Sequence, residues 1–132
     1  MTCGSARRPD DQKPEGVDKV DQIFGVSEGP RHGVSVVTVS GEVDVATAPA
    51  VRDCLDVVIE RDDGMVVVDL LGVTFIDSTG LGVLIGARKR CADEDRELRV
   101  VVSEPRILKV FEITGLTELF TIHPSLDLAL AA

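Results

Sequence analysis

The stretch that most constrains this chain joins an apolar strand to a helix with one apolar face. Residues 65–71, Met-Val-Val-Val-Asp-Leu-Leu, form a near-continuous apolar run, which is typical of a strand covered on both faces. After the Asp-Ser-Thr-Gly sequence at 77–80, a helical stripe carries Leu81, Leu84 and Ile85. A buried strand followed by such a helix is the repeating unit of an α/β fold.

Strand and helix patterns alternate along the rest of the chain. The expected elements are strands at 23–27 and 34–40, a helix from Thr47 to about residue 62, a strand at 65–71, a helix from Ser78, a strand at 98–102, a helix from Ser103 to Gly115, a short edge strand at 119–122 and a helix from about Ser125. The order β-β-α-β-α-β-α-(β)-α predicts parallel neighbours joined by right-handed crossovers, after an initial hairpin with its turn at 29–33.

Local signals mark the ends of two of these helices. Thr47 precedes Pro49, so we expect Thr47 to be an N-cap with proline in the first turn. The spacing of Val51, Leu55 and Val58 gives that helix one apolar face. Gly115 is a candidate C-cap for the helix that begins at Ser103.

The amino-terminal residues differ in composition from the rest of the chain. Residues 1–20 carry proline, glycine and charged side chains with almost no large apolar ones, so we expect a flexible tail there and one folded domain at 21–132. A chain of 132 residues with 44% hydrophobic content suits a single domain. Its four phenylalanines are the only aromatic residues, so the core must be largely aliphatic.

Charge and composition exclude several classes of function. The chain carries 14 basic and 23 acidic residues, a net charge of −9, which argues against nucleic acid as a partner and suits contacts with other proteins. No apolar run approaches the roughly 20 residues that span a bilayer, and residues 1–19 lack a secretory signal, so we expect a cytoplasmic protein without membrane association. The cysteines and histidines show no metal-site spacing.

Ser78 is the candidate functional residue, as a helix cap, a nucleophile or a phosphorylation switch. Its strand-to-helix turn belongs to the carboxyl edge of the sheet, where α/β folds place their sites. A nucleophile elbow requires Gly-x-Ser-x-Gly, but Ile76 stands two residues before Ser78, and His123 is a poor candidate for a base. A phosphate-binding loop is absent as well. A hydrolase or nucleotide-binding protein is therefore disfavoured, and the cap and the switch remain.

Three segments together resemble the STAS domain family, in particular the bacterial anti-sigma factor antagonists. Residues 75–84, Phe-Ile-Asp-Ser-Thr-Gly-Leu-Gly-Val-Leu, are similar to the family's signature. Residues 41–44, Gly-Glu-Val-Asp, and residues 105–116 resemble the end of its second strand and its third helix. The resemblance extends from Val34 to Leu130. It implies the STAS fold, with a mixed four- to five-stranded sheet and helices packed mainly on one face.

The resemblance also implies a function without enzymatic activity or a cofactor. Unphosphorylated antagonists bind an anti-sigma factor, often a serine kinase, and thereby free a sigma factor for transcription. The kinase phosphorylates a serine of the antagonist, which then dissociates, and a serine phosphatase resets it. Carried onto this sequence, the phosphoacceptor is Ser78, and the partner-binding residues are Glu42, Asp44, Asp77, Thr79, Gly80 and Leu81.

Two alternatives remain open beside this interpretation. A STAS domain can also serve as a scaffold or accessory subunit of a stressosome or a lipid-transport complex. The resemblance places the helices that carry Cys54 and Cys91 side by side, which leaves a redox link between them open. The reduced state is the usual one for cytosolic cysteines. We expect a monomer or a weak dimer.

Overall fold

The computed structural model describes residues 24–31, 34–62 and 64–130, with side chains from Val34 onward; the tail expected at 1–20 lies outside this part. The strands are β1 (Phe24–Arg31), β2 (Val34–Val43), β3 (Val66–Ile76), β4 (Leu98–Val101) and β5 (Thr121–His123). The helices are α2 (Ala48–Arg61), α3 (Ser78–Asp93), α4 (Pro105–Ile113) and α5 (Leu126–Leu130), with a 3-10 turn η3 (Leu116–Glu118).

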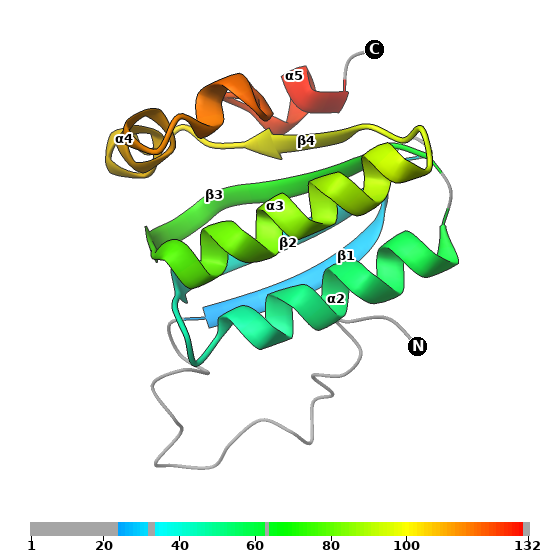
Figure 1. The fold of residues 1–132 in the computed structure, drawn as a ribbon, viewed down its shortest axis with the longest axis horizontal. Coiled ribbons are helices and arrows are strands. Elements are labelled where there is room, and N and C mark those ends of the chain that lie inside the picture. The colour runs from blue at the N-terminus through cyan, green and yellow to red at the C-terminus, as the bar shows by residue number, and fades with distance from the viewer. Residues whose placement is uncertain (1–23, 32–33, 63, 131–132) are drawn as a thin grey trace.

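The strands form one mixed sheet in the order β1-β2-β3-β4-β5. β1 pairs antiparallel with β2, whereas β2, β3, β4 and β5 are mutually parallel. Each parallel connection carries a helix, and α2 and α3 lie side by side over the sheet (Figure 1). The predicted alternation is therefore confirmed, and the sheet has five strands. None of the helices in the described residues is long and apolar enough to cross a membrane.

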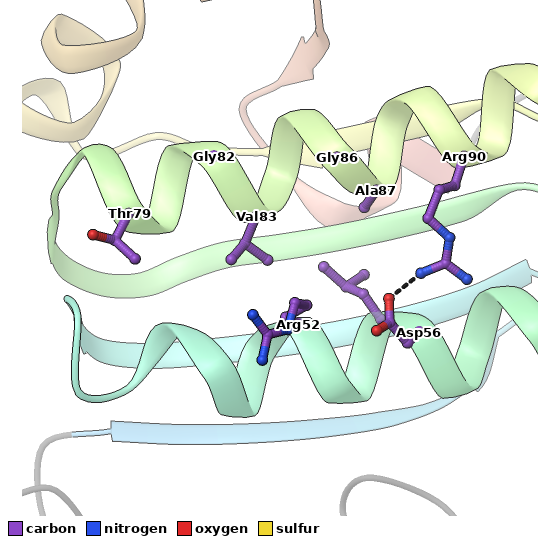
Figure 2. Close-up of a pocket in the computed structure, with 9 residues that line it drawn as sticks. Arg52, Asp56, Thr79, Gly82, Val83, Gly86, Ala87 and Arg90 are labelled. Carbon is purple, nitrogen blue, oxygen red and sulfur yellow. Dashed lines mark hydrogen bonds and ion pairs between the residues drawn. The ribbon is translucent and has the colours of Figure 1, made fainter.

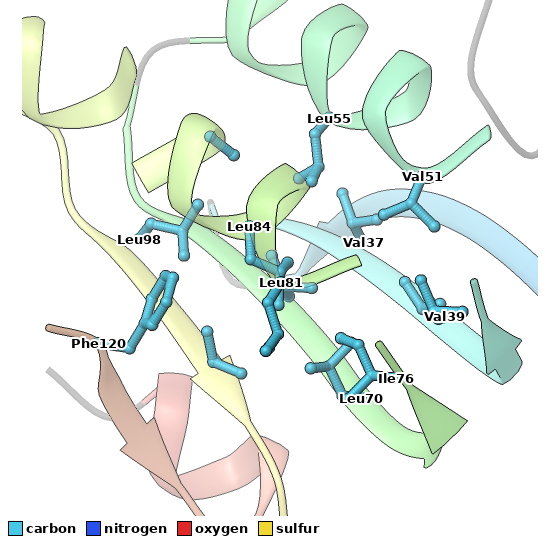
Figure 3. Packing of buried hydrophobic residues seen from close by; sticks show 14 of the residues in the cluster. Val37, Val39, Val51, Leu55, Leu70, Ile76, Leu81, Leu84, Leu98 and Phe120 are labelled. Carbon is cyan, nitrogen blue, oxygen red and sulfur yellow. The ribbon is translucent and has the colours of Figure 1, made fainter. Parts of the chain in front are cut away.

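The larger core lies between the sheet and helices α2, α3 and α4. It is aliphatic, as the composition predicts: Val37 and Val39 of β2 face Val51 and Leu55 of α2 (Figure 3). The expected apolar face of α2 is buried along its length. Two phenylalanines of this core meet edge to face, because the rings of Phe111 and Phe120 lie 6.0 Å apart at 74°.

A smaller core lies on the opposite face of the sheet. It contains Val36, Val67 and Val101, and Ala129 of α5 covers them. Val66, Val68 and Leu70 of the same strand point into the larger core, so β3 is covered on both faces as predicted. Because α5 is the helix on this second face, the helices pack mainly on one face, in agreement with the expectation.

Strand β3 is longer than expected and reaches Ile76, at the edge of the site. The expectation ended the strand at Leu71, where the apolar run stops; Gly72 follows, and glycine in a strand often marks a bulge. The interruption is a bulge: the pairing with β2 shifts register between Thr38 and Ser40. The carboxylate of Asp69 stabilises it by accepting a hydrogen bond from the backbone N–H of Leu71 at 2.9 Å.

Two further expectations require correction. β1 runs to Arg31, so Gly29 and Pro30 belong to a strand and not to the turn predicted at 29–33, of which 32–33 lie outside the described residues. An edge strand accommodates Pro30 because its outer side has no ladder partner. In α3, Ile85 is 39% exposed, because the buried stripe runs through Leu84 and Ala87 instead.

Candidate functional site

The carboxyl ends of β2 and β3 meet at one edge of the sheet and hold the candidate site. Glu42 pairs with Phe75 and Val43 with Ile76 in the parallel register. The backbone N–H of Asp77 donates to the carbonyl of Val43 at 3.1 Å. The loop after β2 and the first turn of α3 are thereby fixed beside each other. Glu42 at the end of β2 and Asp44 directly after it consequently lie near the Asp-Ser-Thr-Gly sequence.

Asp77, and not Ser78, is the N-cap of α3. Its backbone is extended (φ −108°, ψ −173°), and its carboxylate accepts a hydrogen bond from the Gly80 N–H at 3.1 Å. Ser78 is the first helical residue, and its side chain is exposed. None of the described residues hydrogen-bonds with the Ser78 hydroxyl. The sequence interpretation that gave Ser78 the capping role is corrected, because the neighbouring carboxylate satisfies the helix end.

Asp44 holds the loop between β2 and α2 in place. Its carboxylate accepts hydrogen bonds from the Ala46 N–H at 3.0 Å and from the Thr47 N–H at 3.2 Å. The Thr47 hydroxyl donates to the Glu42 carbonyl at 2.8 Å, and Thr47 is 3% exposed. Thr47 is the N-cap of α2 as expected, but its hydroxyl binds back into the loop instead of the first helical turn. Asp44 is half-buried, while Glu42 is exposed.

Gly80 and Leu81 point into the protein. A Cβ atom on Gly80 would lie 2.7 Å from Cγ1 of Val43 and 2.8 Å from Cγ1 of Ile76. Leu81 is 6% exposed and belongs to the larger core. The expectation that both residues bind a partner stays a prediction, and in the folded chain they seat α3 against the strand ends. Glycine at position 80 therefore allows α3 to pack closely against the strand ends.

The exposed part of the site is polar and acidic. Ser78, Thr79 and Glu42 are exposed, and Asp77 and Asp44 are half-buried behind them. The first turn of α3 adds backbone donors: the Gly80 and Leu81 N–H groups bind Asp77, but the Ser78 and Thr79 N–H groups have no acceptor among the described residues. A free hydroxyl therefore stands on the amino terminus of a helix, directly after the aspartate that caps it.

Among the described residues, the single histidine, His123, lies far from Ser78. His123 pairs with Val101, and Val101 pairs across β4 and β3 with Asp69. Asp69 stands eight residues before Asp77, and a strand advances about 3.3 Å per residue, so His123 lies roughly 25 Å from the site along the strand direction. The described residues contain no cluster of three or more His, Cys, Asp or Glu that could hold a metal ion.

The two helical cysteines lie on neighbouring helices without forming a bridge to each other. Cys54 on α2 and Cys91 on α3 are both fully buried. Cys91 is a free thiol, and its burial raises its pKa above the usual value. The structure therefore lacks the redox link between Cys54 and Cys91 that the sequence left open. Cys3 lies outside the described residues.

A groove along the seam between α2 and α3 opens beside the site, and sequence reasoning missed it. Its volume is about 480 Å³. Its lining residues come from both helices: Arg52, Leu55, Asp56, Thr79, Gly82, Val83, Gly86, Ala87 and Arg90 (Figure 2). The glycines at 82 and 86 were the available signal, but without a neighbouring helix in place they indicated only a weak helix.

The chain belongs to the STAS domain family, whose pattern matches residues 30–129. An anti-sigma-B factor antagonist of Listeria monocytogenes is 38% identical over 86 residues, covering 65% of this chain and 75% of the relative. One from Staphylococcus aureus is 39% identical over 89 residues, covering 66% of this chain and 81% of the relative. These matches confirm the family that the sequence motifs indicated.

Solved structures give the same result. The crystal structure of an anti-sigma factor antagonist from Mycobacterium paratuberculosis superposes with a TM-score of 0.74 at 34% identity, over 81% of this chain and 91% of that one. Unphosphorylated SpoIIAA superposes with a TM-score of 0.65 over 80% of this chain and 91% of its own, and its 20% identity shows the fold alone. The predicted α/β fold of the STAS type is therefore confirmed.

Proposed function

We propose that this chain is an anti-sigma factor antagonist, which binds an anti-sigma factor and so frees a sigma factor for transcription. The relatives named as antagonists support this function, since they match this chain at 38–39% identity. The observation that carries the proposal is the exposed Ser78 hydroxyl on the amino terminus of α3. The site offers a surface and a modifiable hydroxyl, and we infer that the protein acts by binding, as a cytoplasmic regulator without enzymatic activity.

Phosphorylation of Ser78 is the proposed switch. A phosphoryl group adds about −1.5 to −2 charge at neutral pH. The amino terminus of α3 favours that charge, and the free Ser78 and Thr79 N–H groups are donors for it, so the fold should tolerate the modification. Glu42, Asp44 and Asp77 already make the surface acidic. The added charge therefore acts on a docked partner, through repulsion and desolvation, and not on the stability of the chain.

The anti-sigma factor is proposed to be the kinase that modifies Ser78, and a serine phosphatase to be the enzyme that restores it. The surface around the hydroxyl is built for access by another protein, because Thr79 and Glu42 beside it are also exposed. Asp77 is engaged with the Gly80 N–H at 3.1 Å. Its role is to hold the helix end that presents Ser78.

Binding of purified proteins tests the function. Each serine-kinase anti-sigma factor of the source organism is titrated by calorimetry with the wild-type chain, Ser78→Ala and Ser78→Asp. We expect wild type and Ser78→Ala to bind one of them equally and Ser78→Asp to bind at least tenfold more weakly. Binding of Ser78→Asp with wild-type affinity would move the switch elsewhere. Failure of the wild-type chain to bind any of them would overturn the function.

Labelling with radioactive ATP tests the modified residue. The bound anti-sigma factor should label the wild-type chain and not Ser78→Ala, with Thr79→Ala as the matched control that keeps the label. Label that persists on Ser78→Ala and disappears from Thr79→Ala would assign the phosphoacceptor to Thr79. Urea denaturation of the phosphorylated chain should give a midpoint no lower than that of the unphosphorylated chain, because the switch acts on binding and the amino terminus of α3 favours the added charge.

A further inference from the structure

The groove between α2 and α3 is continuous with the Ser78 surface. Thr79 lines the end of the groove nearest to the amino terminus of α3 and is the direct neighbour of Ser78. From there the groove follows α3 to Arg90, which is about 16 Å at 1.5 Å per residue. In Figure 2 the side chains of Thr79 and Val83 point from α3 toward α2. A partner that binds over Ser78 and extends along α3 would therefore contact this groove next.

The glycines that open the groove are not required by the packing of this chain. A Cβ atom placed on Gly82 or on Gly86 would meet nothing within 4 Å. Glycine inside a helix costs about 1 kcal/mol relative to alanine, so two of them weaken α3. Gly80, in contrast, is required for the seat of the helix on the strands. What Gly82 and Gly86 maintain is open space above the seam.

The groove is apolar on its floor and carries charged side chains along its sides, where Arg52 and Arg90 each pair with an aspartate. Leu55 and Ala87 are buried beneath it, and Val83 is half-buried in its wall. Arg90 is held by an ion pair with Asp56 across the seam (Figure 2). The Arg52 guanidinium lies 3.8 Å from Asp53, and the Arg52 side chain is 59% exposed. On a chain of net charge −9, an exposed guanidinium beside an apolar floor is suited to a carboxylate with an apolar neighbour.

We propose that the α2–α3 groove is the second half of the partner-binding surface and takes one segment of the anti-sigma factor. That segment places an apolar side chain over Val83 and Ala87 and a carboxylate beside Arg52. The inference rests on the proposed function and deepens it, since it divides the surface into two parts. The Ser78 part is sensitive to phosphorylation, and the groove supplies affinity that does not depend on the hydroxyl.

Filling the groove tests the proposal. Gly86 stands eight residues after Ser78, about 12 Å along α3, so Gly86→Leu occupies the groove without touching the switch. Calorimetry with the anti-sigma factor that binds wild type should show at least a tenfold loss of affinity for Gly86→Leu. Lys89→Leu is the matched control, because it adds the same side chain to α3 outside the groove and should bind as wild type.

Charge reversal is the second arm and does not depend on how Gly86→Leu folds. Arg52→Glu, at an exposed position, should weaken binding at least fivefold at low salt. Arg106→Glu is the control, since that side chain is 88% exposed on α4 and away from the groove. Suppose that Gly86→Leu and Arg52→Glu both bind with wild-type affinity while Ser78→Asp loses binding. That result would overturn the proposal for the groove but not the proposed function. Failure of the wild-type chain to bind would overturn both.

A second copy of this chain is the competing occupant. Sedimentation equilibrium of wild type and Gly86→Leu at high concentration distinguishes it from the anti-sigma factor. The proposal expects the same mass for the two proteins. A wild-type dimer that Gly86→Leu dissociates would assign the groove to self-association and overturn the proposal.

Discussion

At the scale of single residues, Asp77 caps α3 and Ser78 presents a free hydroxyl. One side chain could not do both. A capping hydroxyl would be engaged with the backbone and inaccessible to a kinase. Because the Asp77 carboxylate binds the Gly80 N–H at 3.1 Å, Ser78 is left exposed with a free hydroxyl. The cap therefore fixes the helix end without using the Ser78 hydroxyl, as the proposed switch requires.

Substitution of Asp77 separates the cap from the charge. Asp77→Ala should lower the free energy of unfolding by about 1 kcal/mol, because the Gly80 N–H loses its acceptor. Asp77→Asn keeps an acceptor oxygen and should be close to wild type. Urea denaturation of the two variants measures the difference. An Asp77→Asn variant as unstable as Asp77→Ala would show that the negative charge at the helix end, and not the hydrogen bond, stabilises α3.

The glycines of α3 should respond to alanine in opposite directions. Gly80→Ala should destabilise the chain by about 1–3 kcal/mol, because its Cβ would lie 2.7 Å from the Val43 side chain. Gly82→Ala, where a Cβ meets nothing within 4 Å, should stabilise it by up to about 1 kcal/mol. Thermal unfolding of both variants checks the pair. Equal changes in stability for the two variants would contradict the close packing of α3 against the strand ends at Gly80.

The sequence pattern indicated a helix start at the Asp-Ser-Thr-Gly turn but could not decide which of its residues is the cap. Asp77 and Ser78 are both good capping residues, and only the hydrogen bonds of the folded helix decide between them. The same applies to Gly80 and Leu81: their place in the motif suggested contact with a partner, whereas the phase of α3 on the sheet turns both inward. Periodicity gives the spacing of the buried positions along a helix. Which side chains are exposed also depends on how the helix is rotated about its axis, and a shift of one residue changes that set.

At the scale of elements, the end of α2 is fastened to the sheet by Asp62. Its carboxylate accepts hydrogen bonds from the Arg61 guanidinium at 2.9 Å and from the Ser35 hydroxyl of β2 at 2.7 Å. These two contacts, the Arg61 bond first, lower the pKa of Asp62 from 3.8 to about 2. The helix and strand are thereby joined at the edge of the sheet opposite to Ser78.

This link should appear in the pH dependence of stability. Because the folded pKa of Asp62 lies below its unfolded value, its contribution is complete above about pH 4 and is lost as the pH falls toward 2. Asp62→Asn should be less stable than wild type by about 1 kcal/mol at pH 6, a figure reduced for solvent screening, and equal to it at pH 2. Asp93→Asn, whose carboxylate is 64% exposed, is the control. A constant difference between wild type and Asp62→Asn from pH 6 to 2 would contradict the lowered pKa.

Elements with strong local sequence patterns were predicted. Features that depend on contacts between elements, such as strand pairing, were not. The valine run at 66–68 and the helix of Val51 and Leu55 follow directly from their patterns. The extension of β3 to Ile76 does not, because it depends on the bulge that Asp69 stabilises and on pairing with β2. The α2–α3 groove likewise exists only once two helices lie side by side, which no single periodicity describes.

At the scale of the whole molecule, two cores of unequal size divide the fold. The larger one joins three helices to the sheet and carries the site at the strand ends. In the part of the chain that the structure describes, the smaller one is covered by α5, a helix of five residues, on the opposite face of β3. So short a helix has little stability of its own and depends on packing for its order. We therefore expect α5 to open independently of the part of the molecule that binds the partner.

Two neighbouring valines of β3 test this division, because both are 0% exposed and face opposite cores. Val68→Ala, in the larger core, should lower global stability by about 1–3 kcal/mol and reduce amide protection throughout the sheet. Val67→Ala, beneath α5, should increase hydrogen exchange at the Ala129 N–H, which bonds the Ser125 carbonyl at 3.1 Å, more than exchange in α3. Binding of the anti-sigma factor by Val67→Ala should stay at the wild-type level. If protection of α5 followed global stability in both variants, the two cores would unfold as one unit, and the smaller core would be part of the scaffold that holds Ser78 in place.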